Sequence, residues 1–267
     1  MVDKSEKFNW GVRLGYAARG LVYGLLGYIA LTSRDEVREG PAAAFNHVQD
    51  NLPLGSVILW LAALGLLAYA IYRFASLLFD VEHQGSDNKG WMHRIGHGAS
   101  GVAHLVLAYT AVQYASGSGS SGDSTQEAAN TVLSMTLGGL LLGIVGIGFL
   151  VAGVMQGKKG ITGSFMNRVS GAAPSFTKPV GQAGHVARAV VFLIIGWSLV
   201  QSGFLSSGND VKSLGDAIAS LSDNGMIFTL VALGLVLFGV FSIIVARYRI
   251  IPDLGPEGLR PEFRYNG

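Results

Sequence analysis

The sequence contains no cysteine and few charged residues. The absence of cysteine excludes disulfide bonds, thiolate metal sites and cysteine nucleophiles. Asp, Glu, Lys and Arg make up only 13% of the 267 residues, roughly half the charged fraction of an ordinary soluble domain. Hydrophobic residues account for 50% of the chain. This composition is typical of an integral membrane protein.

Acidic residues and prolines are missing from the long apolar runs. No Asp or Glu lies within these runs, although cation-coupled transporters usually carry a carboxylate inside the membrane. All seven prolines fall outside the runs, so the broken helices of many transporters are not expected. The glycine-rich stretch 117–124 lacks the Gly-Lys-Ser/Thr ending of a phosphate-binding loop. We therefore expect no enzymatic activity, and a net charge of +2 does not indicate a nucleic-acid partner.

Six apolar runs are candidates for membrane crossing, which takes about 20 helical residues. The runs lie at 11–33, 54–72, 95–114, 134–155, 189–201 and beyond, and 226–246. If six spans are drawn, all of the 19 Lys and Arg residues except Arg34, Arg38 and Lys212 fall on one side of the membrane. The positive-inside rule then places both termini in the cytoplasm. We expect a multi-pass protein of the bacterial inner membrane.

The chain repeats itself three times. Shifts of 81 and then 88 residues superpose one glycine in the first helix and one in the second helix of each unit. These glycines are Gly15, Gly96 and Gly184 in the first helices, and Gly65, Gly146 and Gly234 in the second helices. The predicted fold is a single all-α integral membrane domain, residues 1–267, with six transmembrane helices arranged as three parallel two-helix repeats around a pseudo-threefold axis. The repeats are expected at about 11–80, 92–157 and 181–249, before a polar C-terminal tail at 250–267.

Glycines four residues apart recur within the apolar runs. Examples are Gly20 with Gly24 and Gly139 with Gly143. Small residues at this spacing let two membrane helices approach closely. The pattern predicts close helix packing and says nothing of catalysis.

Each repeat begins with a polar stripe on one face of its first helix. In the three repeats the stripes are Tyr16, Arg19 and Tyr23; His97, Ser100 and His104; and His185, Arg188 and Phe192. Spacings of three and seven residues place the members of each stripe on one helical face. If the stripes converge, they form an interior site that suits an anion, a lipid headgroup or water. If they diverge, the Arg and His side chains extend to the membrane surface or bond neighbouring helices. The candidate ligand-binding residues are Tyr16, Arg19, Tyr23, His97, Ser100, His104, His185 and Arg188.

Three classes of function are compatible with these stripes. The first is a non-enzymatic accessory or binding protein that engages membrane lipids, anionic ones among them, a small anion or a larger membrane complex. The second is a channel or transporter for small solutes through an axial cavity. The third is a redox protein that binds haem or quinone, because His97 and His185 should lie at equal depth, as the two ligands of a b-type haem require. No other cofactor or metal site is expected, and Asp80, Glu82 and His83 are interpreted as a solvated loop end.

The repeated motif resembles one family of bacterial membrane proteins. A Gly-[Tyr/His]-x-Ala-[Arg/Ser]-[Gly/Ala] start, followed by a second helix rich in Leu, Val and Gly, is similar to a six-helix family with three tandem two-helix repeats and no known function. The resemblance covers about 13–249, and Ser100 departs from it by replacing an arginine. It implies the fold and a membrane location, and it implies no activity.

Overall fold

The computed structural model describes residues 4–33, 36–119, 130–135, 137–204 and 211–251. In these ranges the regular elements are helices joined by turns and irregular linkers, with one isolated bridge between Val169 and Arg249. Within these ranges the long helices are α1 (Lys4–Thr32), α3 (Gly55–Leu78), α4 (Asn88–Ala115), α6 (Gly138–Thr162), α7 (Thr177–Phe204) and α9 (Gly225–Tyr248). Shorter elements are η1 (Glu36–Glu39), α2 (Pro41–Asn51), η2 (Ser164–Arg168) and α8 (Leu214–Ala219). The expected all-α fold is confirmed.

The long helices coincide with the six predicted spans. Five of them, all except α4, are long and apolar enough to cross a membrane in the described part of the chain. The start of α4 is less apolar because it carries Lys89, His93, Arg94 and His97. Many large apolar side chains are exposed on these helices, as expected for surfaces that face lipid rather than water. The chain is a multi-pass membrane protein.

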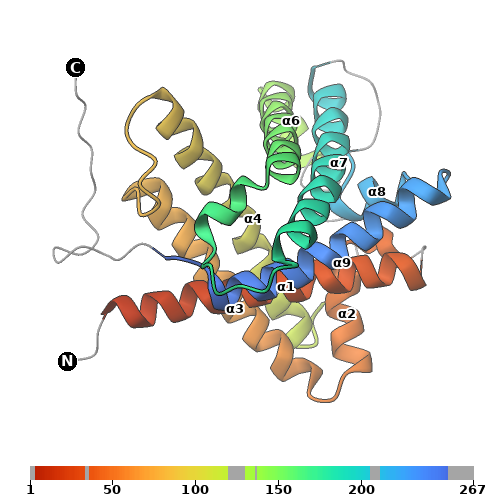
Figure 1. Cartoon of the computed structure of the whole chain (residues 1–267). Coiled ribbons are helices and arrows are strands. Elements are labelled where there is room, and N and C mark those ends of the chain that lie inside the picture. The colour runs from red at the N-terminus through yellow and green to blue at the C-terminus, as the bar shows by residue number, and fades with distance from the viewer. Residues whose placement is uncertain (1–3, 34–35, 120–129, 136, 205–210, 252–267) are drawn as a thin grey trace.

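The most extensive helix packing joins the second helix of one repeat to the first helix of the next. These pairs are α3 with α4, α6 with α7, and α9 with α1. Figure 1 shows α9 running alongside α1, and α6 beside α7. Within the repeats, α1 packs on α3 and α7 packs on α9, whereas α4 and α6 hardly contact each other. The helices therefore form a ring that is open between α4 and α6.

One end of the bundle collects most of the basic residues, and we call it the basic end. Here α1, α4 and α7 begin and α3, α6 and α9 end. An equivalent residue of each repeat caps the neighbouring helix at this end. Arg13 donates to the carbonyls of Ala246 and Arg247, Arg94 donates to those of Leu77 and Leu78, and Gln182 donates to that of Ile161. These caps satisfy terminal carbonyls that have no partner within their own helix, and their recurrence supports the threefold arrangement.

The repeated glycines form tight crossings in the first and third repeats. A Cβ atom on Gly15 would lie 3.0 Å from the carbonyl oxygen of Gly65, and a Cβ atom on Gly184 would lie 2.7 Å from Cβ of Phe238. Both distances are too short for a side chain to fit without movement. A Cβ atom on Gly96, the equivalent of these residues, would meet nothing within 4 Å. The two helices of the second repeat therefore do not cross closely, unlike those of the first and third repeats.

The orientation of α6 explains how the second repeat differs. Gly234 of α9 lies against Ala187 of α7, within its own repeat. The equivalent Gly146 of α6 lies instead against Gly196 of α7, which belongs to the next repeat, with 2.9 Å between its Cβ position and the Gly196 carbonyl oxygen. The face of α6 that should meet α4 is thus used to contact α7.

We expect alanine to be harmful at Gly15 and harmless at Gly96. In Gly15→Ala the added methyl group overlaps α3, and overpacking of this kind costs about 1–3 kcal/mol. In Gly96→Ala the methyl group enters open space, so the free energy of unfolding should stay the same or rise slightly. Thermal unfolding in detergent measures both variants. Equal losses of stability would mean that α4 and α6 are in fact closely packed.

Candidate functional site

The three polar stripes converge on two aromatic side chains of the second helices. Tyr69 of α3 and Phe238 of α9 occupy equivalent positions, each four residues beyond a crossing glycine. Because residues four apart share a helical face, the glycine crossing directs both rings towards the interior. Both rings are almost fully buried. We call the cluster of Tyr16, Arg19, Tyr23, Tyr69, Arg73, Arg188 and Phe238 the basic–aromatic interior.

Arg19 joins the stripe of α1 to both aromatic residues. Its Nη1 donates to the Tyr69 hydroxyl at 3.0 Å, and its Nε donates to the Ser242 hydroxyl at 3.2 Å. Its guanidinium lies 4.5 Å from the centre of the Tyr16 ring and 5.0 Å from that of Phe238. Cation–π contacts of this kind contribute about 2 kcal/mol when they are shielded from water. Aromatic faces therefore surround the charge of Arg19.

Arg188 joins the stripe of α7 to that of α1. Its guanidinium lies 4.4 Å from the centre of the Phe238 ring and 4.9 Å from that of the Tyr23 ring. Its Nε atom is buried and has no hydrogen-bond partner. Among the residues that the structure describes, every ion pair involves Glu82, so neither Arg19 nor Arg188 is paired with a carboxylate there.

The α4 stripe reaches the same interior through Tyr69 and Arg73. Arg73 Nη1 lies 2.9 Å from His97 Nδ1, and since arginine can only donate, this nitrogen accepts. His104 Nδ1 donates to the Ser100 carbonyl at 2.7 Å, and its ring centre lies 4.5 Å from that of Tyr69. The Nε2 atoms of both histidines are buried without partners. Ser100 contributes its carbonyl to this network.

His185 has a different environment from that of His97. Its ring stacks on Phe165 at 4.6 Å between centres, and its edges approach Phe238 and Phe241. Its Nδ1 donates to the Gly181 carbonyl at 2.7 Å. A haem held by His97 and His185 would require these rings to move. The described residues contain no cluster of three or more His, Asp or Glu suited to a metal ion.

The buried carboxylate Glu82 links all three repeats at the basic end. It is only 3% exposed. One oxygen lies 2.9 Å from Arg168 Nη1 in the α6–α7 linker, and the other lies 2.5 Å from Arg249 Nη2 after α9. The Tyr72 hydroxyl also donates to it. The expectation that this linker is a solvated loop end is therefore wrong for Glu82.

The charge balance around Glu82 is strongly positive. Burial alone would lower the pKa of Arg249, but Tyr16 and Glu82 raise it more, so Arg249 keeps its proton. Arg73 lies 4.0 Å from the same carboxylate. Glu82 is thus shared by Arg73, Arg168 and Arg249, while Arg19 and Arg188 add further positive charge to the interior.

Sequence reasoning identified the stripes but missed Tyr69, Arg73, Phe238 and Glu82. The spacing from the crossing glycines could have identified the first three. Tyr69 and Arg73 lie four and eight residues after Gly65, and Phe238 lies four residues after Gly234, on the faces that carry the crossings. No comparable signal existed for the ion pairs of Glu82 with Arg168 and Arg249, which are 86 and 167 residues away in the sequence.

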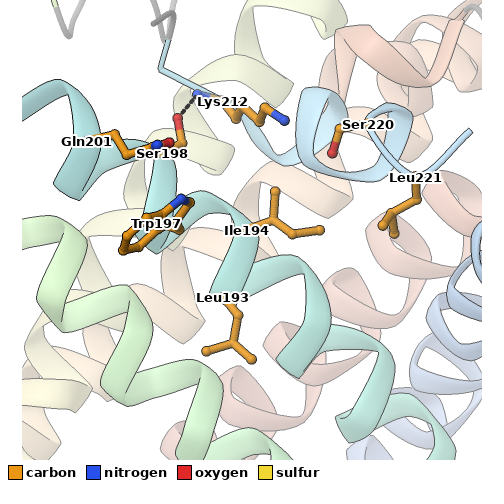
Figure 2. A pocket seen from close by; sticks show the side chains of 8 residues that line it. All are labelled: Leu193, Ile194, Trp197, Ser198, Gln201, Lys212, Ser220 and Leu221. Atoms are coloured by element: carbon orange, nitrogen blue, oxygen red, sulfur yellow. Dashed lines mark hydrogen bonds between the residues drawn. The ribbon is translucent and has the colours of Figure 1, made fainter. Parts of the chain in front are cut away.

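A separate pocket of about 430 Å³ lies beside α7 and α8, far along α7 from His185. Figure 2 shows Trp197, Ser198 and Gln201 of α7 on one side of it, Ser220 and Leu221 on the opposite side, and Lys212 between them next to Ser198. The Lys212 backbone nitrogen donates to the Ser198 hydroxyl at 2.9 Å. None of its lining residues belongs to the stripes, so this pocket is distinct from the basic–aromatic interior.

Comparison with known proteins now identifies the repeat. The family model described as Domain of Unknown Function (DUF1206) matches residues 14–76, 95–163 and 183–249. The chain belongs to the DUF1206 family. It is similar to the Uncharacterized protein YxxB of Bacillus subtilis (strain 168), with 31% identity over 246 residues, which cover 89% of this chain and 90% of that protein. No solved structure matches. The resemblance inferred from the repeated motif is thus confirmed.

We expect Glu82→Gln to destabilise this DUF1206 protein. The substitution leaves Arg168 and Arg249 without their carboxylate. Breaking a buried ion pair costs about 3–5 kcal/mol, and we expect the lower end because Arg168 is partly exposed. Unfolding in detergent measures the loss. The matched control is Glu36→Gln, since Glu36 is exposed. If both variants are equally stable, Glu82 does not hold the repeats together.

Proposed function

We propose that the protein is a non-enzymatic binding or accessory component of the bacterial inner membrane, and that it binds an anionic group in the basic–aromatic interior. The observation that carries this proposal is the burial of Arg19 and Arg188 without carboxylate partners in the described part of the chain. The basic end would face the cytoplasm, in agreement with the distribution of Lys and Arg.

The energetics of buried charge favour an anionic ligand. Removing an arginine from water costs several kcal/mol even after relaxation of the surroundings. Aromatic faces and hydroxyls offset part of that cost, but the unpartnered Nε of Arg188 shows that donors remain available. Phosphate and carboxylate groups accept from arginine with good geometry, often through two hydrogen bonds. An anion near both guanidinium groups would complete the charge balance.

The two alternative classes have no comparable support. In this conformation the interior is filled by rings such as Tyr16 and Tyr69, whose centres are 5.0 Å apart, so a transport path would need these rings to separate. A haem would need Phe165 to leave His185. Binding of an anion at the free donor of Arg188 requires neither a continuous path through these rings nor the displacement of Phe165.

The proposal is tested by ligand-dependent stabilisation. The purified protein in detergent is heated with inorganic phosphate, with dioctanoyl phosphatidylglycerol, or with dioctanoyl phosphatidylcholine. A ligand at about 100 times its Kd stabilises the folded state by about 2.7 kcal/mol, which should raise the Tm by several degrees for a chain of this size. We expect stabilisation by at least one of the two anions, and the first two arms separate a free anion from a lipid headgroup.

Variants then locate the binding site. Arg19→Gln combined with Arg188→Gln should abolish the stabilisation, whereas the exposed Arg38→Gln should retain it. Arg19→Lys with Arg188→Lys preserves the charges and should retain weaker binding, provided that circular dichroism shows the same helix content. Unchanged stabilisation in the double Gln variant would contradict the proposal.

A further inference from the structure

The opening between α4 and α6 is a feature that the other two repeats lack. In repeats 1 and 3 the residues that form the crossing are buried, whereas their equivalents on α4 are exposed. The exposed residues are Gly96, Ala99 and Ala103; their buried equivalents are Gly15, Ala18 and Val22 in α1, and Gly184, Ala187 and Val191 in α7. We call these three residues the open face of α4.

Two substitutions in the second repeat explain why it is open. Repeats 1 and 3 each pair an arginine of the first helix with an aromatic residue of the second helix. In the second repeat the equivalent positions hold Ser100 and Leu150, which cannot form a cation–π contact. Leu150 lies instead against Gly196 of α7. The glycines that permit a crossing are present, but the contact that would hold it closed is missing.

The walls of the opening are apolar and carry no negative charge. Neither α4 nor α6 contains Asp or Glu. The large side chains that α6 exposes are mostly apolar, among them Ile144, Val151 and Val154. Within a bilayer, a space between apolar helices is filled by hydrocarbon, since water finds no hydrogen-bonding partner there. The chemistry of the walls therefore matches the acyl chains of a lipid.

Cations lie at the basic end of the opening. Lys159 is exposed near the end of α6, next to Lys158. Arg73 of α3 lies 2.9 Å from His97 Nδ1 of α4. Lys159 of α6 and this Arg73–His97 pair therefore both lie at the basic end, where α3 and α6 end and α4 begins. A phosphate at this position would be attracted by Lys159, Arg73 and the unpartnered Nε2–H of His97.

We propose that the opening between α4 and α6 binds one anionic phospholipid, with its acyl chains along the open face of α4 and its phosphate at Lys159, Arg73 and His97. The inference rests on the proposed function and specifies its ligand as a membrane lipid that enters sideways from the bilayer. Closing α6 onto α4, as in the other two repeats, would expel this lipid.

A disulfide bond can force the opening to close. Gly96 and Leu150 are the equivalents of the contacting pairs Gly15–Tyr69 and Gly184–Phe238, whose Cβ positions approach more closely than a disulfide requires. A disulfide between cysteines at 96 and 150 therefore holds α4 and α6 together without reproducing the full crossing, and the chain has no other cysteine to interfere. The double variant Gly96→Cys, Leu150→Cys is reconstituted in nanodiscs of phosphatidylglycerol or of phosphatidylcholine and then oxidised. We expect phosphatidylglycerol to slow disulfide formation at least tenfold. Equal rates in the two lipids would overturn the proposal.

Native mass spectrometry of the same variant measures lipid retention. The reduced variant sets the reference level of phosphatidylglycerol retention, and the same variant after oxidation should retain at least tenfold less. Lys159→Gln should also reduce retention, whereas Lys178→Gln, which changes an exposed lysine of α7, should not. Unchanged retention in both the oxidised protein and Lys159→Gln would overturn the proposal.

The arginine variants separate this inference from the proposed function. If the closed disulfide form still binds phosphatidylglycerol but Arg19→Gln with Arg188→Gln does not, the interior binds the anion and the opening is not its entrance. If closing the opening removes the lipid while the arginine variant retains it, the opening is the lipid site and the interior is not an anion site.

Discussion

The close approach of helix backbones at the glycine crossings is the constraint on which the rest of the structure depends. Helices inside a bilayer gain no hydrophobic free energy by associating, so they rely on close packing and polar contacts. At Gly15 and Gly184 the approach leaves no room for a side chain. Tyr69 and Phe238 lie one helical turn after the crossing glycines Gly65 and Gly234, so their rings are directed inward. These rings contact the buried arginines, and the crossings therefore also determine where the positive charge of the interior lies.

The sequence predicts much of this arrangement because the membrane imposes simple rules. Span length and the placement of Lys and Arg follow from the bilayer, and the recurrence of glycine at fixed shifts reveals the repeats. The three stripes follow from helical geometry and the repeat, but the sequence left open whether they converge, because helical periodicity does not fix the direction in which a face points. Tyr69 was not identified because an aromatic residue on an apolar helix is equally compatible with a lipid-facing position, and only its spacing from Gly65 distinguishes it.

The open second repeat could not be predicted from its glycines. Gly96 and Gly146 remove a steric obstacle to a close crossing, but small residues alone provide no attraction that would form one. The attraction that closes the other repeats comes from an arginine on an aromatic ring, and Ser100 and Leu150 do not supply it. The same backbone pattern therefore gives two different packings. The identity of two side chains, rather than the repeated motif, decides between them.

The position of Glu82 determines where the ring can open. Its ion pairs with Arg168 and Arg249 fasten the α3–α4 linker to the α6–α7 linker and to the end of α9. Arg168, which ends η2 shortly after α6, is thus held at the basic end. Along the rest of its length α6 does not pack closely on α4. At the basic end the opening is therefore bounded by the fastened linkers. If a ligand reaches the interior between α4 and α6, it passes along the sides of these helices and not through the linkers at this end.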